Sequence, residues 1–174
     1  MAGRRVFPGG RVERADTLAD GALPVSADDM ALLQSELRPA RTDRRAHGFA
    51  HCAIRETAEE TGLAVGASTL ATPVRYIARA ITPPGMARRF DTRFFLAVVR
   101  VPLPPCAKGD GELDGIGWYA AEDHGEADLH PITRLVIDIA TGRLSADPDL
   151  TDPVQITFHR LVRGRPRITA HRLT

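Results

Sequence analysis

The sequence predicts an α/β fold in which helices pack against a mixed β-sheet. Two observations support this prediction. Helical patterns fill the first part of the chain, and the later part alternates between strand patterns and one further helix. The chain has 174 residues, of which 43% are hydrophobic and 26% charged, as is usual for a soluble globular protein. We therefore expect a single domain over residues 1–174.

Two helices are predicted in the first part of the chain. Ser26 is a candidate N-cap for a short helix, and Pro39 ends it. This helix carries three apolar residues at helical spacing, Met30, Leu33 and Leu37. A second helix is expected from about Asp43 to Thr61, because Gly62 stands where a glycine commonly follows a helix.

Two strands are predicted next. Val74 to Ile81 and Phe90 to Val101 are rich in β-branched and aromatic residues, and the turn residues 82–85 join them. Phe94 to Val99 is a continuous apolar run, which is typical of a strand that is covered on both faces.

The rest of the chain predicts a strand, a helix and a hairpin. Ile116 to Tyr119 is expected to form a short strand, and Pro131 to begin a helix. Val154 to Leu161 and Arg167 to Leu173 alternate between apolar and polar residues. We therefore expect a C-terminal β-hairpin within residues 151–174.

Charge and cysteine content narrow the possible partners and compartment. The net charge of +1 gives no global electrostatic reason to expect nucleic acid or an acidic membrane as a partner. Cys52 and Cys106 lie far apart in the sequence. We therefore expect them to be free thiols in a reducing cytosol. Neither a membrane span nor a signal segment is evident. We expect a cytoplasmic protein that acts on a small molecule.

Residues 55–63 carry the most informative chemistry. Glu56, Glu59 and Glu60 are spaced by three and four positions, which places neighbouring side chains on one face of a helix. Like charges repel there, so a hard divalent cation such as Mg²⁺ or Mn²⁺ would explain them. The alternative is an acidic helix face that is simply solvated.

A glycine-rich stretch precedes this helix, and such a loop can present backbone groups to a phosphate or a metal. Carboxylates that hold Mg²⁺ beside phosphate oxygens are typical of phosphoryl or pyrophosphate transfer. One carboxylate left partly free could accept a proton from the attacking water.

These residues resemble the Nudix box, which is written G-x5-E-x7-R-E-U-x-E-E-x-G-U, where U is a bulky aliphatic residue. The half from Arg55 to Leu63 matches at every specified position except Thr57, and Phe7-Pro8-Gly9-Gly10 precedes it. The resemblance implies a Nudix-type α/β/α sandwich with a mixed β-sheet. It also implies Mg²⁺- or Mn²⁺-dependent hydrolysis of a nucleoside diphosphate that is linked to another moiety.

The resemblance assigns roles to individual residues. Glu56, Glu59 and Glu60 match the metal-binding carboxylates, and Gly10 matches the glycine whose backbone carbonyl can reach the metal. Arg55 matches the arginine that orients the carboxylates through charge-assisted hydrogen bonds. Glu56, Glu59 and Arg55 are therefore expected to be catalytic.

Two acids outside the helix also have counterparts in the family. Asp16 stands six positions after Gly10, where the box has a glutamate, so it is a shorter acid at that place. Glu112 lies six residues before Trp118 and matches a loop acid that serves some family members as a further ligand or base. The alternative for Glu112 is an ordinary loop acid.

The spacing of the box suggests a subgroup. Arg55 lies 45 positions after Gly10, where the signature has 14, which fits an insertion over residues 17–42. A similar insertion marks a Nudix subgroup that contains coenzyme A diphosphatases. CoA or acyl-CoA is therefore the leading expected substrate.

Two arginines are candidates for substrate binding. Residues 88–95 also resemble that subgroup, and Arg89 and Arg93 within them could clamp substrate phosphates. The alternative is that these arginines are solvent-facing charges at a strand edge.

The resemblance also implies one or two strands before Phe7, and this sequence has almost no residues there. We expect the C-terminal hairpin or a partner in a homodimer to supply strands instead. The alternative to an active enzyme is a catalytically silent or N-terminally truncated Nudix-fold protein that binds a nucleotide.

Overall fold

A mixed four-stranded β-sheet with the strand order β2-β1-β3-β4 forms the centre of the molecule. The computed structural model describes most of the chain: residues 5–37, 42–66, 68–100, 115–122, 129–152, 155–162 and 165–172. The sheet combines antiparallel and parallel pairs and has helices packed against it, which confirms the predicted α/β class.

The C-terminal hairpin supplies half of this sheet. β1 (Arg75–Ile81) pairs antiparallel with β2 (Asp91–Leu96) on one side and parallel with β3 (Gln155–Val162) on the other. β3 then pairs antiparallel with β4 (Arg165–Arg172), as the alternation in the sequence predicts. The hairpin therefore extends the sheet beyond β1, at the end opposite β2.

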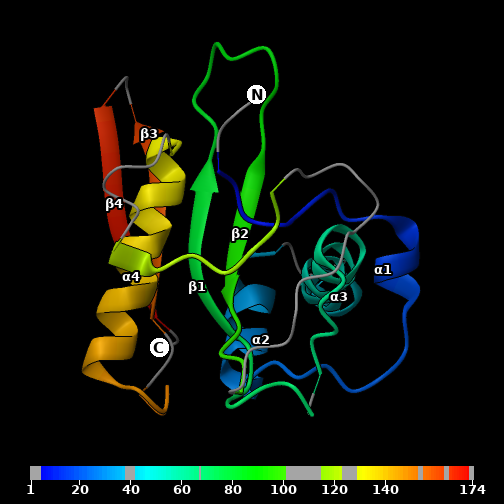
Figure 1. Cartoon of the computed structure of the whole chain (residues 1–174). Helices are drawn as coiled ribbons and strands as arrows, with labels where there is room; N and C mark the ends of the chain where they lie inside the picture. The colour runs from blue at the N-terminus through cyan, green and yellow to red at the C-terminus, as the bar shows by residue number, and fades with distance from the viewer. Residues whose placement is uncertain are drawn as a thin grey trace.

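Helices pack against both faces of the sheet (Figure 1). On one face lie α2 (Ala27–Ser35) and α3 (Thr42–Thr61), and the other is covered by α4 (Pro131–Ala146). Between α2, α3 and the sheet, in what we call the first layer, lies a buried cluster of Leu32, Leu33, Ala46, Tyr76 and Ile156. Between α4 and the other face of the sheet, in the second layer, lie the buried residues Ile77, Ala78 and Val136. Phe95 packs in the first layer, whereas Phe94 and Leu96 pack in the second, so β2 is covered on both faces as predicted.

Local signals in the sequence place the helix ends. Ser26 precedes α2 as its N-cap residue, and Pro131 occupies the first turn of α4, where its missing N–H costs no hydrogen bond. Gly62 follows α3 with a φ of 71°, a left-handed conformation that glycine adopts without strain.

The structure corrects three sequence-based expectations. The short helix α1 (Arg14–Leu18) was not predicted, since residues 16–42 are mostly polar. β2 ends at Leu96 rather than at Val101, and beyond it Val99 makes only an isolated bridge to Leu70. The predicted strand Ile116 to Tyr119 is wrong, because this segment has no partner strand among the described residues and its two aromatic side chains are exposed.

Residues 5–13 contain no strand; Arg5 forms an isolated parallel bridge with Leu129. None of the helices in the described part of the chain has the length and apolar character that crossing a membrane requires.

Candidate functional site

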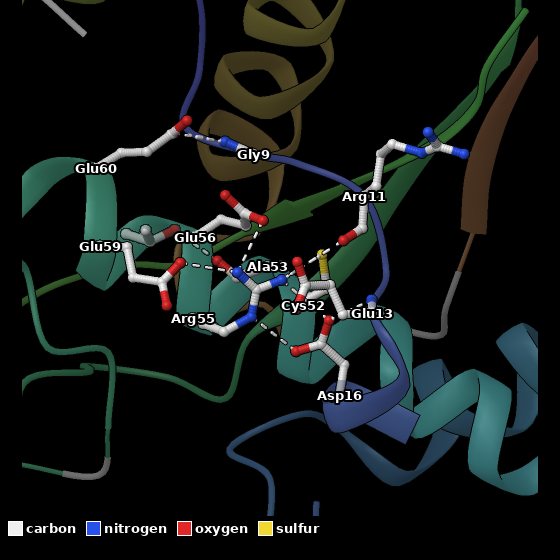
Figure 2. Close-up of polar contacts among 11 residues, drawn as sticks. Gly9, Arg11, Glu13, Asp16, Cys52, Ala53, Arg55, Glu56, Glu59 and Glu60 are labelled. Carbon is white, nitrogen blue, oxygen red and sulfur yellow. Dashed lines mark hydrogen bonds and ion pairs between the residues drawn. The ribbon is translucent and has the colours of Figure 1, made fainter. Parts of the chain in front are cut away.

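Arg55 stands at the centre of a cluster of carboxylates on α3 and α1 (Figure 2). Its Nε lies 2.9 Å from Oδ1 of Asp16, and its Nη2 lies 3.0 Å from Oδ2 of the same residue. Its Nη1 lies 2.9 Å from Oε1 of Glu56 and 2.8 Å from Oε2 of Glu59. One guanidinium therefore fixes three acids, as its planar fork of donors allows.

Asp16 and Arg55 connect the two halves of the motif across 39 positions of sequence. Asp16 is 3% exposed, and its Oδ2 also accepts a hydrogen bond from the Glu13 N–H over 2.8 Å. Sequence reasoning matched Asp16 to an acidic position of the box but did not identify Arg55 as its partner. The glycine that lies six positions before Asp16 was the signal that singled it out.

Hydrogen bonding sets the charge states of this pair. The hydrogen bond from Arg55 lowers the pKa of Asp16, and the hydrogen bond to Asp16 raises the pKa of Arg55. Both groups are therefore charged at neutral pH. Arg55 thus offsets the mutual repulsion of the acids that it contacts.

The segment before α1 runs along α3 beside these acids. The Gly9 N–H donates to Oε2 of Glu60 over 2.8 Å, and the Arg11 carbonyl lies 3.5 Å from Nη2 of Arg55. A Cβ atom at Gly10 would fall 2.2 Å from Oε1 of Glu56. Only glycine fits at this position without displacing Glu56.

The three glutamates of α3 do not share one environment. Glu56 and Glu59 both contact Arg55, whereas Glu60 points toward Gly9 (Figure 2). Glu59 and Glu60 are consecutive, and consecutive helical residues point about 100° apart. Accordingly, the described residues contain no group of three or more His, Cys, Asp or Glu side chains arranged to hold a metal ion.

Two of these glutamates, together with the backbone of Gly10, still offer oxygen ligands that suit a hard divalent cation. Glu56 and Glu59 offer carboxylate oxygens on adjacent turns, held by one arginine. The Gly10 backbone lies against the Glu56 carboxylate, which a larger residue would displace. Oxygen ligands of this type are those that Mg²⁺ and Mn²⁺ take in proteins. These residues are thus compatible with the predicted cofactor.

Thr57, which departs from the Nudix signature, is accommodated within the helix. Its hydroxyl donates to the Ala53 carbonyl over 2.7 Å, one turn earlier in α3. The polar group is therefore paired, and α3 continues through it to Thr61.

Cys52 lies under the cluster as a buried free thiol. Burial raises its pKa to about 11, so the thiol is protonated at neutral pH. Its sulfur lies 3.8 Å from Nη2 of Arg55, which makes it part of the packing around the guanidinium.

The other predicted site residues lie elsewhere. The Arg93 side chain is 4% exposed; it lies 3.6 Å from Glu36 Oε2 and stacks over the Phe49 ring at 3.9 Å. Arg89 is exposed, and its Nε lies 3.4 Å from the Thr82 carbonyl. Among the described residues, neither forms a hydrogen bond or an ion pair with Glu56 or Glu59. Glu112 lies outside the described residues.

The fold of this chain has a counterpart among solved structures. No protein-family model matches the chain, and no curated protein matches it. The chain is similar to the crystal structure of a NUDIX hydrolase from Alicyclobacillus acidocaldarius, with 26% sequence identity and a TM-score of 0.56. The alignment covers 85% of this chain and 78% of that chain.

This likeness supports the Nudix superfamily. The mixed sheet with helices on both faces is consistent with a Nudix-type fold. The segment that resembles the Nudix box contributes Arg55, Glu56 and Glu59 to the cluster.

Proposed function

We propose that this protein is a divalent-cation-dependent hydrolase that cleaves the pyrophosphate linkage of a nucleoside diphosphate derivative. The observation that carries this proposal is the cluster in which Arg55 holds Glu56 and Glu59 beside Gly10. The similarity to a solved NUDIX hydrolase supports the same reaction class.

The chain's own residues prepare the site. Arg55 fixes the carboxylates of Glu56 and Glu59, and Asp16 fixes Arg55 in turn. The acids are therefore oriented before substrate binds, which lowers the entropic cost of assembling the site. Mg²⁺ or Mn²⁺ held by Glu56, Glu59 and the Gly10 carbonyl would neutralise phosphate charge and lower the pKa of the attacking water.

A carboxylate must accept the proton of that water. Glu59 suits this role because its side chain is 50% exposed, so that one of its two oxygens would stay free of the cation and open to the water. Glu112 is the second candidate, on the basis of its place before Trp118 in the sequence.

For the substrate we propose CoA or acyl-CoA. The support comes from the sequence: the insertion over residues 17–42 and the stretch 88–95 resemble the CoA diphosphatase subgroup. Arg89 is the more accessible of the two predicted phosphate clamps, since Arg93 is buried.

The test is hydrolysis of a substrate panel in the presence of Mg²⁺ or Mn²⁺. The panel comprises CoA, NADH, ADP-ribose and dinucleoside polyphosphates, with products separated by chromatography. We expect cleavage at the pyrophosphate linkage. Glu59→Gln should reduce kcat/KM about a hundredfold, the order expected when a proton acceptor is lost. Its free energy of unfolding should change by less than about 1 kcal/mol, because the side chain is half exposed.

Two outcomes would contradict the proposal. If no compound is cleaved but one is bound, the protein is a catalytically silent nucleotide-binding member of the fold. If Glu59→Gln retains full activity toward a cleaved compound, the chemistry does not take place at this cluster.

A further inference from the structure

The strand β4 forms one edge of the sheet, at the end opposite β2 (Figure 1). It pairs with β3 without a bulge, from Gln155 opposite Arg172 to Val162 opposite Arg165, and no strand among the described residues pairs with its other side. Alternate N–H and C=O groups of an edge strand point away from its sheet, where another chain can pair with them. β4 therefore offers a regular template for the addition of a strand.

The hairpin of β3 and β4 is strongly basic. Residues 155–172 contain five arginines and no aspartate or glutamate, although the whole chain carries a net charge of only +1. Arg160 and Arg167 stand opposite each other in the register. Both are exposed, and within the described part of the chain neither is in an ion pair. Like charges in directly opposed positions destabilise a strand pair, so an acidic ligand would relieve their repulsion.

The alternation of side chains gives β4 two distinct faces. His171 is paired with Ile156, which belongs to the cluster of the first layer, so His171 and Arg167 lie on that face of the sheet. Ile168 lies on the opposite face and is 56% exposed. A strand added beside β4 would thus place one set of its side chains near Arg167 and the alternate set near Ile168.

Charge argues against a second copy of this chain as the added strand. Two copies of β4 would bring two arginine-rich strands side by side, and charged residues on an edge strand discourage such self-pairing. A partner strand with acidic residues would instead be attracted.

The aromatic content of the hairpin argues against single-stranded nucleic acid, which proteins bind by stacking bases on exposed rings. The Phe158 ring is 5% exposed and lies between guanidinium groups, 5.0 Å from that of Arg79 and 5.2 Å from that of Arg160. The described part of β3 and β4 therefore presents basic side chains and a backbone edge, without an exposed Phe, Tyr or Trp ring.

We propose that the outer edge of β4 binds an extended acidic segment of a partner protein as a fifth strand of this sheet. Acidic and apolar residues alternate in that segment. Its acidic side chains contact Arg167, and its apolar side chains contact Ile168. This interaction surface is separate from the cluster on α3 and does not depend on the proposed function.

The test uses the whole chain and a fluorescein-labelled peptide of about four Glu-Val repeats, with binding measured by fluorescence anisotropy. A Glu-Pro repeat peptide of equal charge is the control, because proline removes every second backbone donor. The variants are Arg167→Glu and Ile168→Asp. Arg45→Glu is the matched control variant, since Arg45 is an exposed arginine on α3.

We expect Arg167→Glu to raise the Kd for the Glu-Val peptide at least about tenfold, because attraction becomes repulsion. Ile168→Asp should raise it at least about threefold, and Arg45→Glu should change it less than about twofold. The Glu-Pro peptide should bind at least about tenfold more weakly than Glu-Val. Arg167→Glu should fold normally, since it places opposite charges across the pair with Arg160.

Hydrogen exchange measured by NMR distinguishes strand addition from a purely ionic contact. Bound Glu-Val peptide should slow exchange at alternate amides of β4 at least about tenfold, because these amides gain hydrogen bonds. Exchange in α4 should stay unchanged.

The proposal is overturned if the Glu-Val peptide does not bind, if Arg167→Glu binds it as tightly as the unmodified chain, or if binding leaves exchange in β4 unchanged. It is also overturned if an oligothymidylate of equal charge binds more tightly than the peptide, since the surface would then suit nucleic acid. Slow exchange at these amides without peptide, together with a dimer in sedimentation, would show that a second copy covers the edge.

Discussion

Two arginine–aspartate pairs in this molecule have similar chemistry and different consequences. In one pair, Nε of Arg55 lies 2.9 Å from the carboxylate of Asp16; in the other, Nε of Arg75 lies 2.6 Å from that of Asp29. Both aspartates are buried, with exposures of 3% and 0%. The difference between the pairs lies in the groups that the remaining donors of each arginine contact.

The remaining donors of Arg75 are directed into the interior. Arg75 also donates to the backbone carbonyls of Leu150 and Asp152, and the Tyr76 N–H donates to Oδ1 of Asp29. The pair therefore fastens α2 to β1 and to the segment after α4. We infer a structural role, because every one of these partners belongs to the framework of the fold.

The remaining donors of Arg55 hold acids at the surface. Nη1 contacts Glu56 and the half-exposed Glu59. The comparison indicates that a buried Arg–Asp pair has a structural role where backbone groups satisfy the arginine. It is suited to function where the arginine presents further carboxylates to solvent.

The first way to test this comparison is to break the interior pair. Asp29→Ala should lower the free energy of unfolding by about 3–5 kcal/mol, because it leaves the Arg75 charge buried without its partner. Urea denaturation measures this change. Asp28→Ala is the matched control on the same turn of α2, is exposed, and should cost less than about 1 kcal/mol. Equal losses in the two variants would rule out the anchoring role.

The second test removes the charge of Asp16. Asp16→Asn should lower the free energy of unfolding by about 2 kcal/mol at neutral pH, the usual value of a hydrogen bond to a charged group. Arg55 lowers the pKa of Asp16, so this stabilisation is complete above the ordinary aspartate pKa of about 3.9. It is lost as the pH falls through the lower pKa of the folded state.

Unfolding curves recorded from pH 7 to pH 2 would check this dependence. The difference between the unmodified chain and Asp16→Asn should shrink as the solution becomes acidic. A difference that stays constant over this range would show that the charge of Asp16 is not what stabilises the pair.

The smallest expected effect concerns the contact of Gly10, in the segment before α1, with Glu56 on α3. Gly10→Ala should raise the Kd for Mn²⁺ about tenfold, because the new Cβ displaces the Glu56 carboxylate. Gly142→Ala in α4 is the control, since a Cβ there meets nothing within 4 Å. It should leave Mn²⁺ binding unchanged and stabilise the protein by about 0.5–1 kcal/mol. Unchanged Mn²⁺ binding in Gly10→Ala would place the cation away from Gly10.

Local signals in the sequence were sufficient to predict several elements. Ser26, Pro131 and Gly62 mark the ends of helices through backbone preferences that act within one turn, although the Ser26 side chain makes no capping hydrogen bond. The C-terminal hairpin was predicted from its alternation, although its place beside β1 was not. The short strand at Ile116 to Tyr119 was predicted wrongly, because strand propensity alone does not provide a pairing partner.

The candidate site could likewise be predicted from the sequence only in part. The sequence by itself determined that Arg55, Glu56, Glu59 and Glu60 lie close together on one helix, because helical spacing is local. Only the tertiary structure decided which partner each side chain has. It brought Asp16 to Arg55 across 39 positions and placed Gly9 beside Glu60 across 51. The physical reason is that the faces of a helix acquire different environments only when other segments pack against them.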